Sequence, residues 1–71
     1  MALRQVFAAN LRRIREERGM SQEALADAAG IDRTYVSALE RELYSVSLDT
    51  LERLAAALNV PPPSLLKEPK D

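Results

Sequence analysis

Residues 21–41 read SQEALADAAGIDRTYVSALER, and this stretch decides the fold of the chain. Ser21 and Asp32 each precede a helical pattern, and side chains of this kind cap helices by accepting a hydrogen bond from a backbone amide. Gly30 lies between the two patterns, where it can adopt the left-handed conformation that a sharp turn requires. The stretch therefore predicts two helices, about residues 22–29 and 33–41, joined as a helix-turn-helix.

The second helix of this pair has two different faces. At about 100° per residue, Val36 and Leu39 fall together on one side, where they anchor the helix to a core. The opposite side carries residues that are small, polar or basic, and such residues suit contact with bases and phosphates in a DNA groove. These residues are Arg33, Thr34, Ser37, Ala38 and Arg41. Duplex DNA is therefore the partner that we expect.

The rest of the chain is also predicted to be helical, with no alternating strand pattern and no internal repeat. Apolar residues recur every three or four positions over about residues 3–18 and 48–58, and Ser47 is placed to cap the second segment. Three prolines at 61–63 end that pattern and begin a short helix of about residues 62–67. We predict an all-α fold, a compact five-helix bundle in a single domain spanning residues 1–71.

The composition argues against several classes of function. The 71 residues include no cysteine and no histidine, which removes disulfides, thiolate metal sites and histidine-based catalysis. Because a phosphate-cradling glycine loop is also missing, we expect no enzyme, no cofactor, no metal site and no pocket for a small-molecule ligand. No apolar run approaches the roughly 18 residues that span a bilayer. A cytoplasmic protein without a membrane partner is the expectation.

The net charge argues against DNA binding at first, and its distribution qualifies that argument. Ten basic and eleven acidic residues give a net charge of −1, whereas DNA-binding domains are usually basic. Five arginines nevertheless cluster between residues 4 and 18, and Arg33 and Arg41 lie on the expected DNA face. We therefore expect few phosphate contacts and a shallow dependence of binding on salt.

Individual side chains suit different contacts. Arg33 is best suited to a base, because its guanidinium can donate to both N7 and O6 of guanine, and a phosphate contact is the alternative. Thr34 and Ser37 can bond to bases or phosphates, and Ala38 is small enough to let the helix lie deep in the groove. Tyr35 falls at the border of the two faces, where its hydroxyl can reach a phosphate or its ring can simply pack over the preceding helix. Flanking phosphate contacts are expected from Arg41, Ser45 and Ser47.

The same residues carry a resemblance to a known family. The patterns are Arg12-x-x-Arg15, Gly19-x-Ser21-Gln22-x-x-Leu25-Ala26, Gly30, Val36-x-x-Leu39-Glu40 and Ser47-Leu48-x-x-Leu51. Over about residues 7–66 they resemble the Cro/C1-type (XRE family) helix-turn-helix proteins of phage and bacterial repressors. The run from Asp32 to Ser37 is most similar to the controller proteins of restriction–modification systems, which are dimeric regulators.

The resemblance implies roles for further residues. Gln22, in a first helical turn whose free amides also suit a phosphate, would contact the DNA backbone and brace the recognition helix. Glu40 would pair with Arg15, since an unpaired carboxylate near the core is costly, and Tyr35 would contact DNA. Glu42 departs from the family, which usually has glycine there. A left-handed conformation costs a glutamate roughly 1 kcal/mol, so we expect a differently shaped helix end or a sequence variant.

A dimer is expected because one recognition helix covers too few base pairs to be selective in a genome. Two copies would read the half-sites of an inverted-repeat operator. Apolar residues beyond the needs of the core form the expected dimer interface: Leu43, Tyr44, Val46, Val60, Leu65 and Leu66. Alternatively, Leu65 and Leu66 only cap the monomer core. The predicted function is a homodimeric DNA-binding transcriptional regulator, and a DNA-binding antitoxin of a toxin–antitoxin pair is the alternative.

Overall fold

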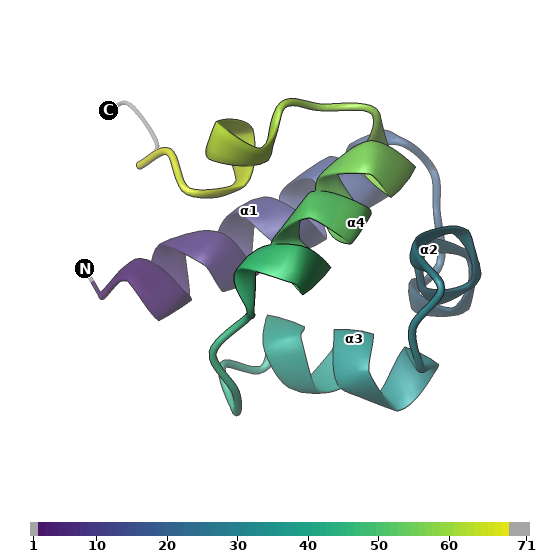
Figure 1. The fold of residues 1–71 in the computed structure, drawn as a ribbon, viewed down its shortest axis with the longest axis horizontal. Helices are drawn as coiled ribbons and strands as arrows, with labels where there is room; N and C mark the ends of the chain where they lie inside the picture. The colour runs from purple at the N-terminus through teal and green to yellow at the C-terminus, as the bar shows by residue number, and fades with distance from the viewer. Residues whose placement is uncertain (1, 69–71) are drawn as a thin grey trace.

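The computed structural model describes residues 2–68, and within them the chain forms helices, turns and loops. Four α-helices and one 3-10 helix follow one another (Figure 1): α1 (Leu3–Glu17), α2 (Gln22–Ala29), α3 (Arg33–Glu40), α4 (Leu48–Leu58) and η1 (Pro62–Leu65). The predicted all-α class and the helix-turn-helix over α2 and α3 are confirmed. No helix in the described range is long and apolar enough to cross a membrane.

The predicted five-helix bundle is corrected to four α-helices and one 3-10 helix, because the short helix predicted over about residues 62–67 is a four-residue 3-10 helix. Its short-range hydrogen bonds join the Ser64 amide to the Pro61 carbonyl at 2.9 Å and the Leu66 amide to the Pro63 carbonyl at 3.0 Å. Pro62 and Pro63 occupy the first two positions, whose amides have no partner in either kind of helix, so the prolines do not exclude an α-helix. The segment has only four residues, and helical pieces this short are commonly 3-10 helices. The bundle consists of four α-helices closed by a tight turn.

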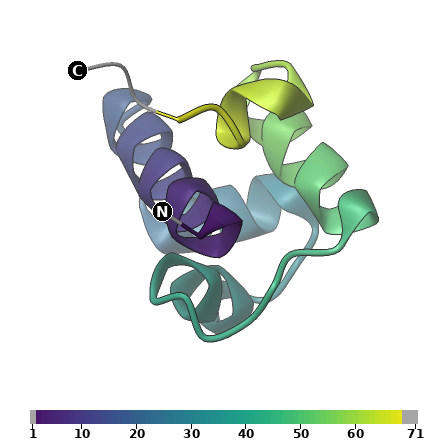
Figure 2. The same cartoon turned by 90° about the vertical axis from the view of Figure 1, so that its left-hand side faces the viewer.

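Each α-helix buries one apolar face in a common core. Phe7, Leu11 and Ile14 of α1 are at most 6% exposed, in agreement with their three- and four-residue spacing. Every other element contributes further buried residues: Leu25, Val36, Leu39, Leu51, Leu54, Leu58 and Leu65. Figures 1 and 2 show α3 and η1 at opposite ends of the molecule, with α1 and α4 between them. The outer side of α3 is therefore left open to solvent.

All four α-helices end in the same way. Just after each helix, one residue has a positive φ. The amide of the residue that follows it donates to a carbonyl in the last turn of the helix, five positions earlier. This arrangement is the Schellman motif. Glu42 has a φ of 64° and closes α3 in this manner, so the predicted differently shaped helix end is wrong. The motif gains two backbone hydrogen bonds, which together offset the steric cost of a left-handed glutamate. The four positive-φ residues are Gly19, Gly30, Glu42 and Asn59.

The C-terminal segment is held on α1 by Asn10, which is only 2% exposed. Its Nδ2 donates to the carbonyls of Leu65 at 3.1 Å and Lys67 at 2.8 Å, and its Oδ1 accepts from Arg13 at 3.2 Å. Leu65 is fully buried in the monomer as a result. Its predicted place in a dimer interface is therefore wrong, and the alternative, in which Leu65 caps the monomer core, is correct.

Candidate nucleic-acid interface

Helix α3 buries one face and presents the other to solvent. Asp32 caps it by accepting a hydrogen bond from the Thr34 amide at 3.2 Å, and Val36 and Leu39 are fully buried. Ala38 was predicted on the DNA face but is only 8% exposed, because α3 packs against both α1 and α2 and its buried side is correspondingly wide. It has little surface to offer to a base. The outer face carries three exposed side chains and a half-buried serine: Arg33, Thr34, Arg41 and Ser37.

A buried ion pair fixes α3 to α1. Arg15 Nε donates to Glu40 Oε2 at 2.7 Å and Arg15 Nη2 donates to Glu40 Oε1 at 3.1 Å, and the two side chains are 11% and 2% exposed. Arg15 Nη1 also donates to the Met20 carbonyl at 2.8 Å. The hydrogen bond to Glu40 raises the pKa of Arg15 above its ordinary value, although burial opposes the shift. The guanidinium therefore stays charged and keeps the buried carboxylate paired.

Gln22 extends this pair to α2. Its Nε2 donates to Glu40 Oε1 at 3.0 Å, so one side chain from each of three helices meets at the end of α3. A shared network of this kind holds the helix from two neighbours at once. The second hydrogen of the Gln22 amide is left for another acceptor, beside the first amides of α2, which have no acceptor within the helix. Gln22 can thus brace α3 and still donate to a phosphate.

The loop of residues 41–47 continues from α3 and leads into α4 (Figure 1). Ser47 Oγ accepts from the Thr50 amide at 3.1 Å and donates to Thr50 Oγ1 at 2.9 Å, so capping already occupies this hydroxyl. Ser45 Oγ accepts from Arg4 Nη2 at 3.0 Å, which brings a further cation to this loop. Sequence reasoning missed Arg4 here, because 41 residues separate the two partners and no local pattern links them.

Two tyrosines meet beside the α3 face. The ring centroids of Tyr35 and Tyr44 lie 6.4 Å apart with an interplanar angle of 55°, a geometry typical of attractive aromatic pairs. Tyr35 is half-buried and packs against the core, whereas Tyr44 is 58% exposed. The sequence analysis placed Tyr44 with the dimer interface, and the structure shows its ring beside Tyr35 of α3.

A second surface, which we call the apolar face, gathers exposed apolar side chains where α1 and α4 begin. Leu3 is 60% exposed and Leu48 is 78% exposed. They line an apolar hollow of about 150 Å³ together with Val46, Leu51 and Leu66. Val46 and Leu66 were predicted as interface residues. The exposure of Leu3 and Leu48 was not predicted, because each continues a helical pattern whose other members are buried.

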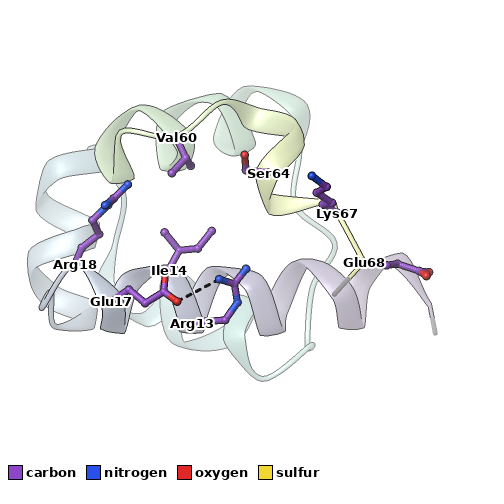
Figure 3. A pocket seen from close by; sticks show the side chains of 8 residues that line it. All are labelled: Arg13, Ile14, Glu17, Arg18, Val60, Ser64, Lys67 and Glu68. Atoms are coloured by element: carbon purple, nitrogen blue, oxygen red, sulfur yellow. Dashed lines mark hydrogen bonds and ion pairs between the residues drawn. The ribbon is translucent and has the colours of Figure 1, made fainter. Parts of the chain in front are cut away.

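The remaining predicted interface residues do not join the apolar face. Leu43 is 53% exposed at the end of α3, and Val60 lines a different groove between α1 and the C-terminal segment (Figure 3). The arginines of that groove already have partners within the chain. Arg13 pairs with Glu17 at 3.3 Å, and Arg18 Nε donates to the Leu58 carbonyl at 2.9 Å.

Comparisons with known proteins point to one family. A sequence profile described as helix-turn-helix matches residues 11–65. The chain is 48% identical over 69 residues to a protein of Neisseria meningitidis named Neisseria hypothetical transcription factor, a match that covers 97% of this chain and 65% of that protein. The crystal structure of that factor has a TM-score of 0.93 over 96% of this chain and 78% of the other. The chain thus spans about two thirds of the full length of this relative.

Further relatives are named for the control of restriction–modification systems. Control protein C.SmaI of Serratia marcescens is 42% identical over 66 residues, which cover 93% of this chain and 79% of that protein. The crystal structure of the restriction-modification controller protein C.AhdI from Aeromonas hydrophila is 42% identical with a TM-score of 0.85, and the match covers 87% of this chain and 94% of that one. The chain therefore belongs to the Cro/C1-type helix-turn-helix family, with restriction–modification controller proteins among its relatives.

Proposed function

We propose that this protein is a sequence-specific, double-stranded DNA-binding transcriptional regulator of the restriction–modification controller type. The observation that carries the proposal is the open face of α3, where Arg33, Thr34 and Arg41 are exposed on a helix that the Arg15–Glu40 pair holds in place. Such a helix fits the major groove, and an arginine in its first turn can donate two hydrogen bonds to a guanine. In this proposal the protein acts in the cytoplasm and catalyses no reaction.

The proposed regulator works as a homodimer on an inverted-repeat operator. One α3 helix contacts too few base pairs for selectivity, so a second copy is needed. The apolar face offers a surface for that copy, since its Leu3 and Leu48 side chains are more than half exposed. It is built by the first half of α1, the loop before α4, the start of α4 and Leu66, which follows η1. Figure 1 shows α1 and α4 above α3. Two copies joined there by a two-fold axis can present both α3 helices to the same side of a duplex.

The amount of dimer then sets the occupancy of the operator. We propose this mechanism of regulation because the equilibrium between monomer and dimer responds directly to protein concentration. Sedimentation at micromolar and at nanomolar protein tests it. Dissociation of the dimer over this range supports the mechanism, and a dimer that persists at the lowest concentration removes it.

Selection of bound duplexes from a random pool at about 0.1 M salt tests the function itself. The experiment uses the wild type, Arg33→Ala and a matched control, Arg53→Ala, which removes an exposed arginine from α4. We expect an enriched inverted repeat with a guanine in each half-site, and Arg33→Ala should relax the preference at that position alone. Arg53→Ala should leave the preference unchanged. Weak binding without any enriched sequence would contradict the proposal.

A further inference from the structure

The exposed loop that follows α3 is fixed at two points. At its start, Glu42 has a φ of 64°, and the Leu43 amide bonds back to α3 at 3.0 Å. Farther along, Arg4 Nη2 donates to Ser45 Oγ at 3.0 Å and ties the loop to α1. Tyr44 lies between these two points. The backbone on either side of Tyr44 is therefore directed by contacts within the chain, although the side chain itself is 58% exposed.

The backbone conformation of Glu42 determines the position of Tyr44. Left-handed backbone is unfavourable for a residue with a β-carbon, and strained residues of this kind persist where the surrounding structure requires them. Here the left-handed turn reverses the chain after α3 and leads it to Tyr35, with 6.4 Å between the two ring centroids. A contact that is mostly exposed buries little area, so its main effect is on the position of the rings and less on the stability of the core.

Tyr35 is the member of this pair that belongs to α3. It is half-buried at the border between the core and the open face, two residues after Arg33. A tyrosine at such a border has to settle into one side-chain orientation when DNA binds, and that ordering weakens the affinity. We propose that Tyr44 is a positioning residue for DNA recognition, which orders the Tyr35 ring before DNA arrives. The inference rests on the proposed function, because it assigns a role within the same interface.

A double-mutant cycle tests this role with the duplex that the wild type enriches from a random pool. Tyr44→Ala should weaken binding about 3- to 10-fold, the range expected when one side chain must be ordered on binding. It should also relax the base preference at the positions that Tyr35→Ala affects. In the Tyr35→Ala background, Tyr44→Ala should cause no further loss. Tyr44→Phe keeps the ring and should bind like the wild type, and the thermal midpoint of Tyr44→Ala should stay close to that of the wild type.

Three results would overturn the proposal. The first is additive losses in the cycle, because independent residues do not couple. The second is weaker dimerisation of Tyr44→Ala in sedimentation together with an unchanged base preference. This result would indicate that Tyr44 belongs to the dimer interface. The third is failure of the wild type to enrich any duplex, which overturns the proposed function as well. The first two results leave the proposed function intact, so the two kinds of failure are distinguishable.

Discussion

Glu42 offers the sharpest test of how this sequence determines its structure. Its φ of 64° lies in the left-handed region, which costs a residue with a β-carbon about 1–2 kcal/mol. Glycine avoids this cost but loses about 0.5–1 kcal/mol more backbone entropy on folding. Glu42→Gly should therefore raise the free energy of unfolding by about 0.5–1 kcal/mol. In a domain of this size, that gain corresponds to a rise of about 2–8 °C in the thermal midpoint.

Thermal unfolding followed by circular dichroism measures this shift, and two further variants isolate its cause. Glu42→Ala removes the carboxylate but keeps the β-carbon, so its midpoint should stay near that of the wild type. Gly30→Ala makes the reverse change at a φ of 71°, where an added β-carbon meets no atom within 4 Å. Gly30→Ala should therefore lower the free energy of unfolding only through backbone strain. The decrease should be similar in size to the increase that Glu42→Gly causes.

Either of two results would refute this reasoning about strain. If Glu42→Ala stabilises the protein as much as Glu42→Gly, the gain comes from removing a negative charge and not from the backbone. If Glu42→Gly brings no gain at all, the left-handed glutamate carries no net cost in this loop. Within residues 2–68 the Glu42 carboxylate makes no hydrogen bond or ion pair that would supply a compensating contact.

Two further predictions concern the brace of α3 and the apolar face. Arg15→Ala should lower the free energy of unfolding by about 3–5 kcal/mol, because it leaves the Glu40 carboxylate, which is 2% exposed, without its cation. Urea denaturation measures this free energy. A loss no larger than that caused by Arg53→Ala, at an exposed arginine, would contradict the prediction. Leu48→Glu should raise the dimer dissociation constant at least about tenfold, because a dimer through this face would bury the new carboxylate. Sedimentation measures this effect, and an unchanged constant would place the dimer interface elsewhere.

The helix-turn-helix could be predicted because its determinants are local. Ser21 and Asp32 cap the two helices by bonds to amides two or three residues away. Gly30 has the left-handed φ of 71° that the turn requires. The apolar spacing of α1 likewise reports which of its faces is buried. In each case the residues that determine the structure are neighbours in the sequence, so a single chain is enough to recognise them.

The parts that could not be predicted depend on contacts between distant segments or on competing small energies. The Arg4–Ser45 hydrogen bond is one example, since no sequence pattern connects a residue of α1 to this loop. The pairing of Tyr44 with Tyr35 is another, because it follows from the direction of the chain after Glu42. The direction of the chain depends on a balance between two small free energies. A left-handed glutamate costs about 1–2 kcal/mol, and two backbone hydrogen bonds together contribute about 1–3 kcal/mol.

The charge of the proposed DNA face supports the part of the proposal in which the regulator acts as a dimer. Arg33 of α3 and Arg41, which directly follows α3, are exposed cations. Arg4 lies at the adjoining loop, where Glu42 partly offsets these charges. Each phosphate contact changes the slope of log K against log salt concentration by about −0.9. Even if all three of these arginines in each protomer contacted phosphates, the slope for a dimer would be about −5. One protomer alone would bind weakly to any sequence. In a dimer, both protomers contribute to the affinity for DNA that carries the correct pair of half-sites. The low positive charge keeps the affinity for non-specific DNA weak. Selectivity in the proposed regulator therefore depends on base contacts and on association through the apolar face more than on overall attraction to DNA.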